Sequence, residues 1–164
     1  MITIRHATGE DLPRILDIYN EVIIHTTAVY SYEPHTLAMR TEWFETKQQQ
    51  GFPVLVASEN NLIVGFCTLG PFRMWPAYQH TVENSIYVAA EARGKGVGKL
   101  LMAPLIDAAK SLGKHAIVAG IDSSNIASIN LHQQFGFAEV AHFKEVGWKF
   151  DRWLDLKFLE LILH

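Results

Sequence analysis

The sequence has little cysteine, little net charge and no long apolar run, and each shortage excludes a class of protein. The single cysteine, Cys67, excludes an internal disulfide, and no Asn-x-Ser/Thr glycosylation acceptor is present. A formal net charge of −3 offers no overall field for a nucleic-acid backbone. No run approaches the roughly 20 apolar residues that span a bilayer, and the N-terminus lacks a signal-peptide pattern. We therefore expect a cytoplasmic protein that binds neither nucleic acid nor membrane.

The chain has 164 residues, of which 49% are hydrophobic, so we expect a single domain over residues 1–164. Apolar periodicity divides it into strands and helices of a mixed α/β (α+β) sheet. The expected elements, in order, are a strand at 1–7, helices from Thr8 to about Ile24 and from about Thr36 to Gln49, a hairpin of PVLVAS and LIVGFCTLG, a strand TVENSIYVA, a helix from Val97 to Leu112, a strand HAIVAGI, a helix in NIASINLHQQFGF, and two C-terminal strands.

The stretch EARGKGVGKLL places three glycines and three cations between Arg93 and Lys99, where the TVENSIYVA strand turns into a helix. Free backbone amides at such a turn, together with the helix dipole, form an anion site that favours phosphate. The P-loop pattern is not met, because Leu100 follows Lys99, and the dinucleotide pattern is not met, because its third glycine would fall on Lys99. A glycine-rich turn with solvated lysines is the alternative reading.

Arg-Gly-x-Gly-x-Gly after a strand resembles the pyrophosphate signature of the GNAT superfamily of N-acetyltransferases, and NIASINLHQQFGF resembles its second motif. The resemblance implies acetyl-CoA as co-substrate and the GNAT fold, a mostly antiparallel twisted sheet with a splayed parallel strand pair, flanked by about four helices. It also implies that the coenzyme is bound by the turn, by strand amides that polarise the thioester, and by the second motif: Arg93, Gly94, Lys95, Gly96, Val97, Gly98, Lys99, Ile86, Tyr87, Val88, Asn125 and Ser128.

Three further blocks resemble the branch that acetylates phosphinothricin, methionine sulfoximine and methionine sulfone: TTAVYSYEPHT, PFRMWPAYQHTVENSIYV and FKEVGWKFDRWLDLKFLEL. This resemblance implies direct acetylation of the α-amino group of a small amino-acid analogue, an activity of the antibiotic or herbicide resistance type. It also implies a homodimer, in which the TTAVYSY loop could complete the partner's site. Within the branch pattern, the substrate would be bound by Arg73, Met74, Trp75, Tyr78, Glu83, Asn84 and Ser85.

Candidate catalytic groups follow from the chemistry of acyl transfer. Glu83 lies on the strand face opposite Asn84 and could relay the ammonium proton, although a structural pairing with a cation such as Arg73 is the alternative. Arg73 has the guanidinium fork that fits a substrate carboxylate. His132 stands where many superfamily members carry a tyrosine, so it either protonates the coenzyme A thiolate or only caps or packs its helix.

Several alternatives remain open from the sequence. Cys67 lies in an apolar strand and is expected to be an inert core thiol, which favours direct transfer over an acetyl-cysteine intermediate. No close pair of histidines has metal-ligand spacing, so no metal is expected. The rival functions are an N-terminal or peptide acetyltransferase and a non-catalytic acyl-CoA-binding sensor.

Overall fold

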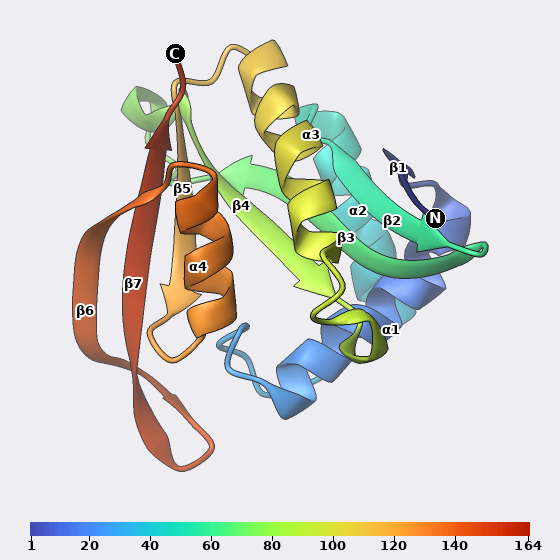
Figure 1. Cartoon of the computed structure of the whole chain (residues 1–164), viewed down its shortest axis with the longest axis horizontal. Helices are drawn as coiled ribbons and strands as arrows, with labels where there is room; N and C mark the ends of the chain where they lie inside the picture. Colours follow the sequence, from blue (N-terminus) through green and yellow to red (C-terminus); the bar gives the residue numbers. More distant parts are fainter.

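A seven-stranded sheet in the order β1-β2-β3-β4-β5-β7-β6 forms the centre of the computed structural model, which covers residues 1–164 (Figure 1). Every neighbouring pair is antiparallel except β4 and β5, which confirms the predicted fold class. The strands are β1 (Ile2–His6), β2 (Val54–Glu59), β3 (Leu62–Pro71), β4 (Thr81–Val88), β5 (Ala116–Asp122), β6 (Ala138–Lys149) and β7 (Arg152–Ile162).

The parallel pair β4 and β5 separates partway along its length (Figure 1). The two strands pair only where Thr81–Glu83 lie beside Ala116–Val118. Beyond that point β4 continues to Val88 and β5 to Asp122 without pairing to each other. The facing edges therefore keep backbone donors and acceptors that no strand partner satisfies, and these groups are free to bind a ligand.

Four helices cover the two faces of the sheet: α1 (Leu12–His25), α2 (Leu37–Gln50), α3 (Val97–Ser111) and α4 (Ile126–Gln134). Helices α1 and α2 lie on one face, where Tyr19 and Trp43 meet the rings of Tyr87 and Phe66. Helices α3 and α4 lie on the other face, where His132 contacts Asn84 of β4. Successive residues of β4 therefore point to different helix pairs, as strand alternation requires.

Local signals in the sequence account for most element boundaries. Asn60 and Asn61 both have positive φ, 51° and 65°, and form the two-residue turn between β2 and β3. Thr36 caps α2 by accepting a hydrogen bond from the amide of Met39, and Gly51, with φ of 74°, ends that helix. The first helix differs from expectation, because a 3-10 turn over Gly9–Asp11 precedes it and α1 begins only at Leu12.

None of the helices combines the length and apolar character needed to cross a membrane.

Candidate active site

The glycine turn connects β4 to α3 and presents free amides. Gly94 and Gly96 have φ of 77° and 83°, values that favour glycine, and open space surrounds the position of a Cβ at each. Gly96 is the N-cap of α3 and supplies no side-chain acceptor, so the first amides of the helix remain available to an anion. Gly98 has a different role, because a Cβ there would lie 2.9 Å from Cδ2 of Leu131 on α4. The turn is thus both open to a ligand and closely packed against α4.

A cavity of about 310 Å³, here called the turn cavity, lies between this turn, β4 and α4. It brings together most of the residues assigned to the coenzyme: Ile86, Val88, Arg93, Gly94, Gly96, Val97, Gly98, Lys99, Asn125 and Ser128. Lys95 and Tyr87 do not line it. Arg93 is held to one side by Glu21, 2.6 Å away, and by the carbonyl of Val88.

A second cavity of about 250 Å³, here called the splay cavity, lies where β4 and β5 separate. Its walls are Glu83 to Tyr87 of β4 and Ala119 to Asp122 of β5, closed by parts of α4 and of the loop after α1. Ile86, Asn125 and Ser128 line both this cavity and the turn cavity. A path therefore leads from the α3 N-terminus along β4 to Glu83.

The carboxyl group of Glu83 occupies the inner end of this path. Burial raises the pKa of Glu83, and the nearby Lys47 ammonium opposes the shift. Gly120 of β5 faces this carboxyl group. A Cβ at that position would lie only 3.2 Å from Oε1 of Glu83, so the absence of a side chain at Gly120 makes room for the carboxyl group. Glu83 takes part in none of the ion pairs of the structure, and the alternative of a pairing with Arg73 is therefore wrong.

His132 and Asn84 both line the splay cavity, where their side chains form a hydrogen bond with each other. Nδ2 of Asn84 donates to Nε2 of His132, and Nδ1 of His132 donates to the carbonyl of Ser128. Burial lowers the pKa of His132, which favours the neutral ring. This geometry argues against His132 as the proton donor to a thiolate, because its one proton is already bonded to Ser128.

The loop between β3 and β4 lies apart from these cavities. The guanidinium of Arg73 stacks 5.0 Å from the ring of Trp75 and 5.7 Å from that of Tyr78. Met74 and Trp75 are 92% and 62% exposed. None of the four lines the turn or splay cavity, so their role in substrate binding stays a prediction.

Sequence reasoning missed the residues that hold the loop after α1 in place. Asp122 at the end of β5 accepts hydrogen bonds from Thr27 at 2.9 Å, from Tyr30 at 2.6 Å and from Ser124. Burial alone would raise the pKa of Asp122, but the bonds from Ser124, Tyr30 and Thr27 lower it. Ala28 and Val29 line the splay cavity as a result, so the TTAVYSY loop forms part of its own chain's site. The hydroxyl groups of that loop were the available signal.

Two further sequence-based expectations concern reactive groups. Cys67 is fully buried, and burial raises the pKa of its thiol to about 12, which confirms an unreactive core cysteine. The structure contains no cluster of three His, Cys, Asp or Glu side chains that could hold a metal ion.

Comparison with known proteins gives one family. The acetyltransferase (GNAT) family model matches residues 13–137. The L-methionine sulfoximine/L-methionine sulfone acetyltransferase of Salmonella typhimurium is 43% identical over 162 residues, which cover 99% of this chain and 95% of that protein. The phosphinothricin N-acetyltransferase of Streptomyces coelicolor is 37% identical over 162 residues, which cover 97% of this chain and 95% of that protein. A solved acetyltransferase from Salmonella typhimurium with its cofactor acetyl-CoA superposes with a TM-score of 0.98 at 43% identity, covering 99% and 94%.

Proposed function

Because this chain belongs to the acetyltransferase (GNAT) family, we propose that it transfers the acetyl group of acetyl-CoA to the α-amino group of a small amino-acid analogue. The substrates are of the methionine sulfoximine, methionine sulfone or phosphinothricin type, on which its relatives act by name. The observation that carries the proposal is the path formed by the two cavities, which share Ile86, Asn125 and Ser128 and end at Glu83.

In the proposed reaction the glycine turn holds the pyrophosphate and the splayed edge of β4 receives the pantetheine arm. The amides of Ile86 and Val88, which alternate with the β3-bonded amide of Tyr87 and face the open edge of β4, polarise the thioester carbonyl where negative charge develops. Glu83 takes a proton from the substrate ammonium, directly or through water. The amine nitrogen then forms a bond to the acetyl carbon, the carbon–sulfur bond breaks, and the departing thiolate takes up the second proton that the nitrogen loses as the amide forms. The inert Cys67 supports direct transfer without an acetyl-enzyme.

Purified protein incubated with acetyl-CoA and each of the three analogues tests the proposal. Release of coenzyme A thiol with any of them, at a rate that depends on the amine, is the expected result. Turnover only on a panel of peptide N-termini would replace the small-molecule assignment with a peptide acetyltransferase. Acetyl-CoA binding without turnover on any amine would leave the sensor function.

The same family membership leads us to propose a homodimer. The hairpin of β6 and β7 exposes large side chains: Trp148, Phe150 and Trp153 are 45%, 52% and 59% exposed. The rings of Trp148 and Trp153 pack together with centroids 4.8 Å apart. Such a surface suits a second copy of the chain. Sedimentation analysis of the wild-type protein and of Trp153→Glu tests this, and a wild-type monomer at micromolar concentration would contradict it.

A further inference from the structure

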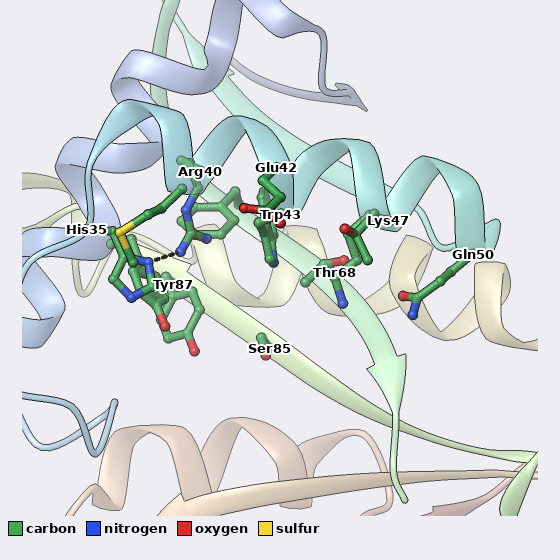
Figure 2. A pocket seen from close by; sticks show the side chains of 13 residues that line it. His35, Arg40, Glu42, Trp43, Lys47, Gln50, Thr68, Ser85 and Tyr87 are labelled. Atoms are coloured by element: carbon green, nitrogen blue, oxygen red, sulfur yellow. Dashed lines mark hydrogen bonds between the residues drawn. The ribbon is translucent and has the colours of Figure 1, made fainter. Parts of the chain in front are cut away.

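A third cavity, of about 500 Å³, lies between α2 and the sheet, on the face away from α3 and α4 (Figure 2). Side chains from the underside of α2 point across it toward β3 and β4 (Figure 2). The residues that matter here are Arg40, Trp43, Lys47, Thr68, Ser85 and Tyr87. We call this space the α2 cavity.

Arg40 is a buried cation without an anion. It is 2% exposed, and its guanidinium lies 4.0 Å from the ring centroid of Tyr19 and 4.4 Å from that of Trp43. One nitrogen donates to Nδ1 of His35 at 2.9 Å, while Nε is buried with no hydrogen-bond partner. Arg40 belongs to none of the ion pairs of the structure. A buried charge is costly unless it is paired, so an anion is the expected partner.

Lys47 supplies a second cation from the next turns of α2. Its Nζ donates to the carbonyl of Leu69 at 2.7 Å and, like Arg40, belongs to no ion pair. Gly70 provides the space for this ammonium, because a Cβ there would lie 2.9 Å from Nζ. Burial and the charge of Arg40 lower the pKa of Lys47, whereas Glu83 raises it. The two cations therefore act on each other, and Lys47 also acts on the carboxyl group of the proposed active site.

The α2 cavity adjoins that active site. Ser85 and Tyr87 line both the α2 cavity and the splay cavity. Gly70, over which the Lys47 ammonium lies, is the cross-strand partner of Glu83. An α-amino acid carries its carboxylate one carbon from its amine, so a substrate whose amine faces Glu83 can place the carboxylate toward Lys47.

We propose that the α2 cavity binds the carboxylate of the acyl acceptor, with Lys47 and Arg40 as the cations that hold it. The inference rests on the proposed function and adds to it the residues that select an α-amino acid over a simple amine. It assigns the carboxylate to α2 and not to Arg73, whose guanidinium lies on an exposed loop outside the described cavities.

The test compares L-methionine sulfone with its carboxamide, which lacks the negative charge. Lys47→Met is expected to raise the KM of the carboxylate substrate at least about tenfold relative to that of the carboxamide, the loss of one charge-assisted hydrogen bond. The ratio of the two KM values is decisive, because any effect of Lys47 on Glu83 acts equally on both substrates. The exposed Lys110→Met, on the far helix α3, serves as the matched control and is expected to leave the ratio unchanged.

Two further variants make the test specific. Gly70→Ala retains every charge but displaces the Lys47 ammonium, so it should shift the ratio in the same direction by a smaller factor. Arg73→Ala should leave the ratio unchanged. An unchanged ratio in Lys47→Met, or a tenfold change in Arg73→Ala instead, would overturn the inference while leaving the acetyltransferase function intact.

Binding without acetyl-CoA separates this inference from the proposed function. Calorimetry with L-methionine sulfone is expected to show affinity that falls about tenfold in Lys47→Met and in Arg40→Gln but not in Lys110→Met. If no amine is acetylated and this pattern still holds, the proposed function fails and the anion pocket stands. Equal affinity in wild type and Lys47→Met would remove the pocket. Arg40 is buried, so circular dichroism must first show that Arg40→Gln folds; Lys47→Met decides the outcome if it does not.

Discussion

Nδ2 of Asn84 donates a hydrogen bond to Nε2 of His132 across 3.1 Å, and both side chains are buried between β4 and α4. Because Nδ1 of His132 also donates to the carbonyl of Ser128, both ring nitrogens have partners. The pair connects β4 to α4 at the level of the splay cavity. We infer that His132 positions β4 and does not exchange protons with the substrate.

Replacing His132 with glutamine should therefore reduce stability more than catalysis. Burial lowers the pKa of His132 in the folded chain below its ordinary value of 6.5. The unfolded chain takes up a proton near that pH and the folded chain does not, so the free energy of unfolding decreases as the pH falls through 6.5. Urea unfolding at pH 7.5 and at pH 5.5 should show a smaller decrease in His132→Gln than in wild type.

The exposed His115→Gln serves as the control and should keep the wild-type decrease. His35, whose pKa is also lowered by burial and by Arg40, contributes with the same sign and remains in both variants. Equal pH dependence in wild type and His132→Gln would contradict a buried neutral imidazole. A loss of kcat in the ~10²–10⁴ range expected for a general acid would restore the catalytic role.

Glu83→Gln should separate coenzyme binding from chemistry. The amide cannot accept the ammonium proton, so kcat should fall by ~10²–10⁴, the usual contribution of a general base. The affinity for acetyl-CoA should stay unchanged, because Glu83 lies outside the turn cavity. Steady-state kinetics and calorimetry measure the two quantities, with Glu45→Gln on the exposed side of α2 as control. Full activity in Glu83→Gln would exclude it as the base.

The pH dependence of kcat/KM should show an acidic limb set by Glu83. Burial raises its pKa above the ordinary value of 4.5, and the base must be ionised to act, so activity is lost as the pH falls through the raised pKa. Lys47 lowers the pKa of Glu83, so Lys47→Met should move this limb to higher pH. A limb that moves to lower pH in the variant would show that the two groups do not interact as the structure indicates.

The sequence was sufficient for the order of the elements because the signals for it are local. The Asn60–Asn61 turn, the Thr36 cap and the positive-φ Gly51 each depend on residues within one turn of the chain. The predicted start of the first helix was wrong. Acidic residues after a Thr8 cap are as compatible with a 3-10 turn as with the first turn of an α-helix, and the structure has the 3-10 turn there.

The site was predicted only where it follows from a motif. The glycine turn and Asn125 could be assigned because their motifs resemble those of the GNAT superfamily, and they do line one cavity. The role of the α2 cations could not be predicted from the sequence. Arg40 contacts Tyr19 on α1 and His35 in a loop, and sequence periodicity does not determine how separate elements pack against each other. The contact between His132 and Asn84 likewise joins residues 48 positions apart.

Two glycines on either end of α3 offer a matched pair for testing the turn. Gly96 and Gly113 have φ of 83° and 70°, and neither has an atom within 4 Å of a Cβ position. Alanine at either position should cost about 1–2 kcal/mol of stability, because a side chain disfavours this backbone conformation. Only Gly96→Ala should also raise the KM of acetyl-CoA several-fold, since Gly113 lies outside the turn cavity. Equal KM values in the two variants would contradict a pyrophosphate site at the turn.

Lys149 forms hydrogen bonds with the end of α1 and with the loop that follows it, so replacing this side chain should destabilise both segments. Its buried Nζ donates to the carbonyls of Ile23, Thr26 and Val29 at 2.6, 2.7 and 2.8 Å. Methionine fills a similar volume but satisfies none of these acceptors, and an unsatisfied buried group costs about 1–3 kcal/mol. Lys149→Met should therefore lose on the order of 3 kcal/mol in urea unfolding.

The exposed Lys144→Met, on the same strand, should lose far less, because its ion pair with Asp155 is 3.6 Å long and open to solvent. Val29 lines the splay cavity, so the same Lys149→Met variant should also raise the KM of the amine at temperatures where it remains folded. Equal unfolding midpoints for Lys149→Met and Lys144→Met would show that the loop after α1 is held by Asp122 alone.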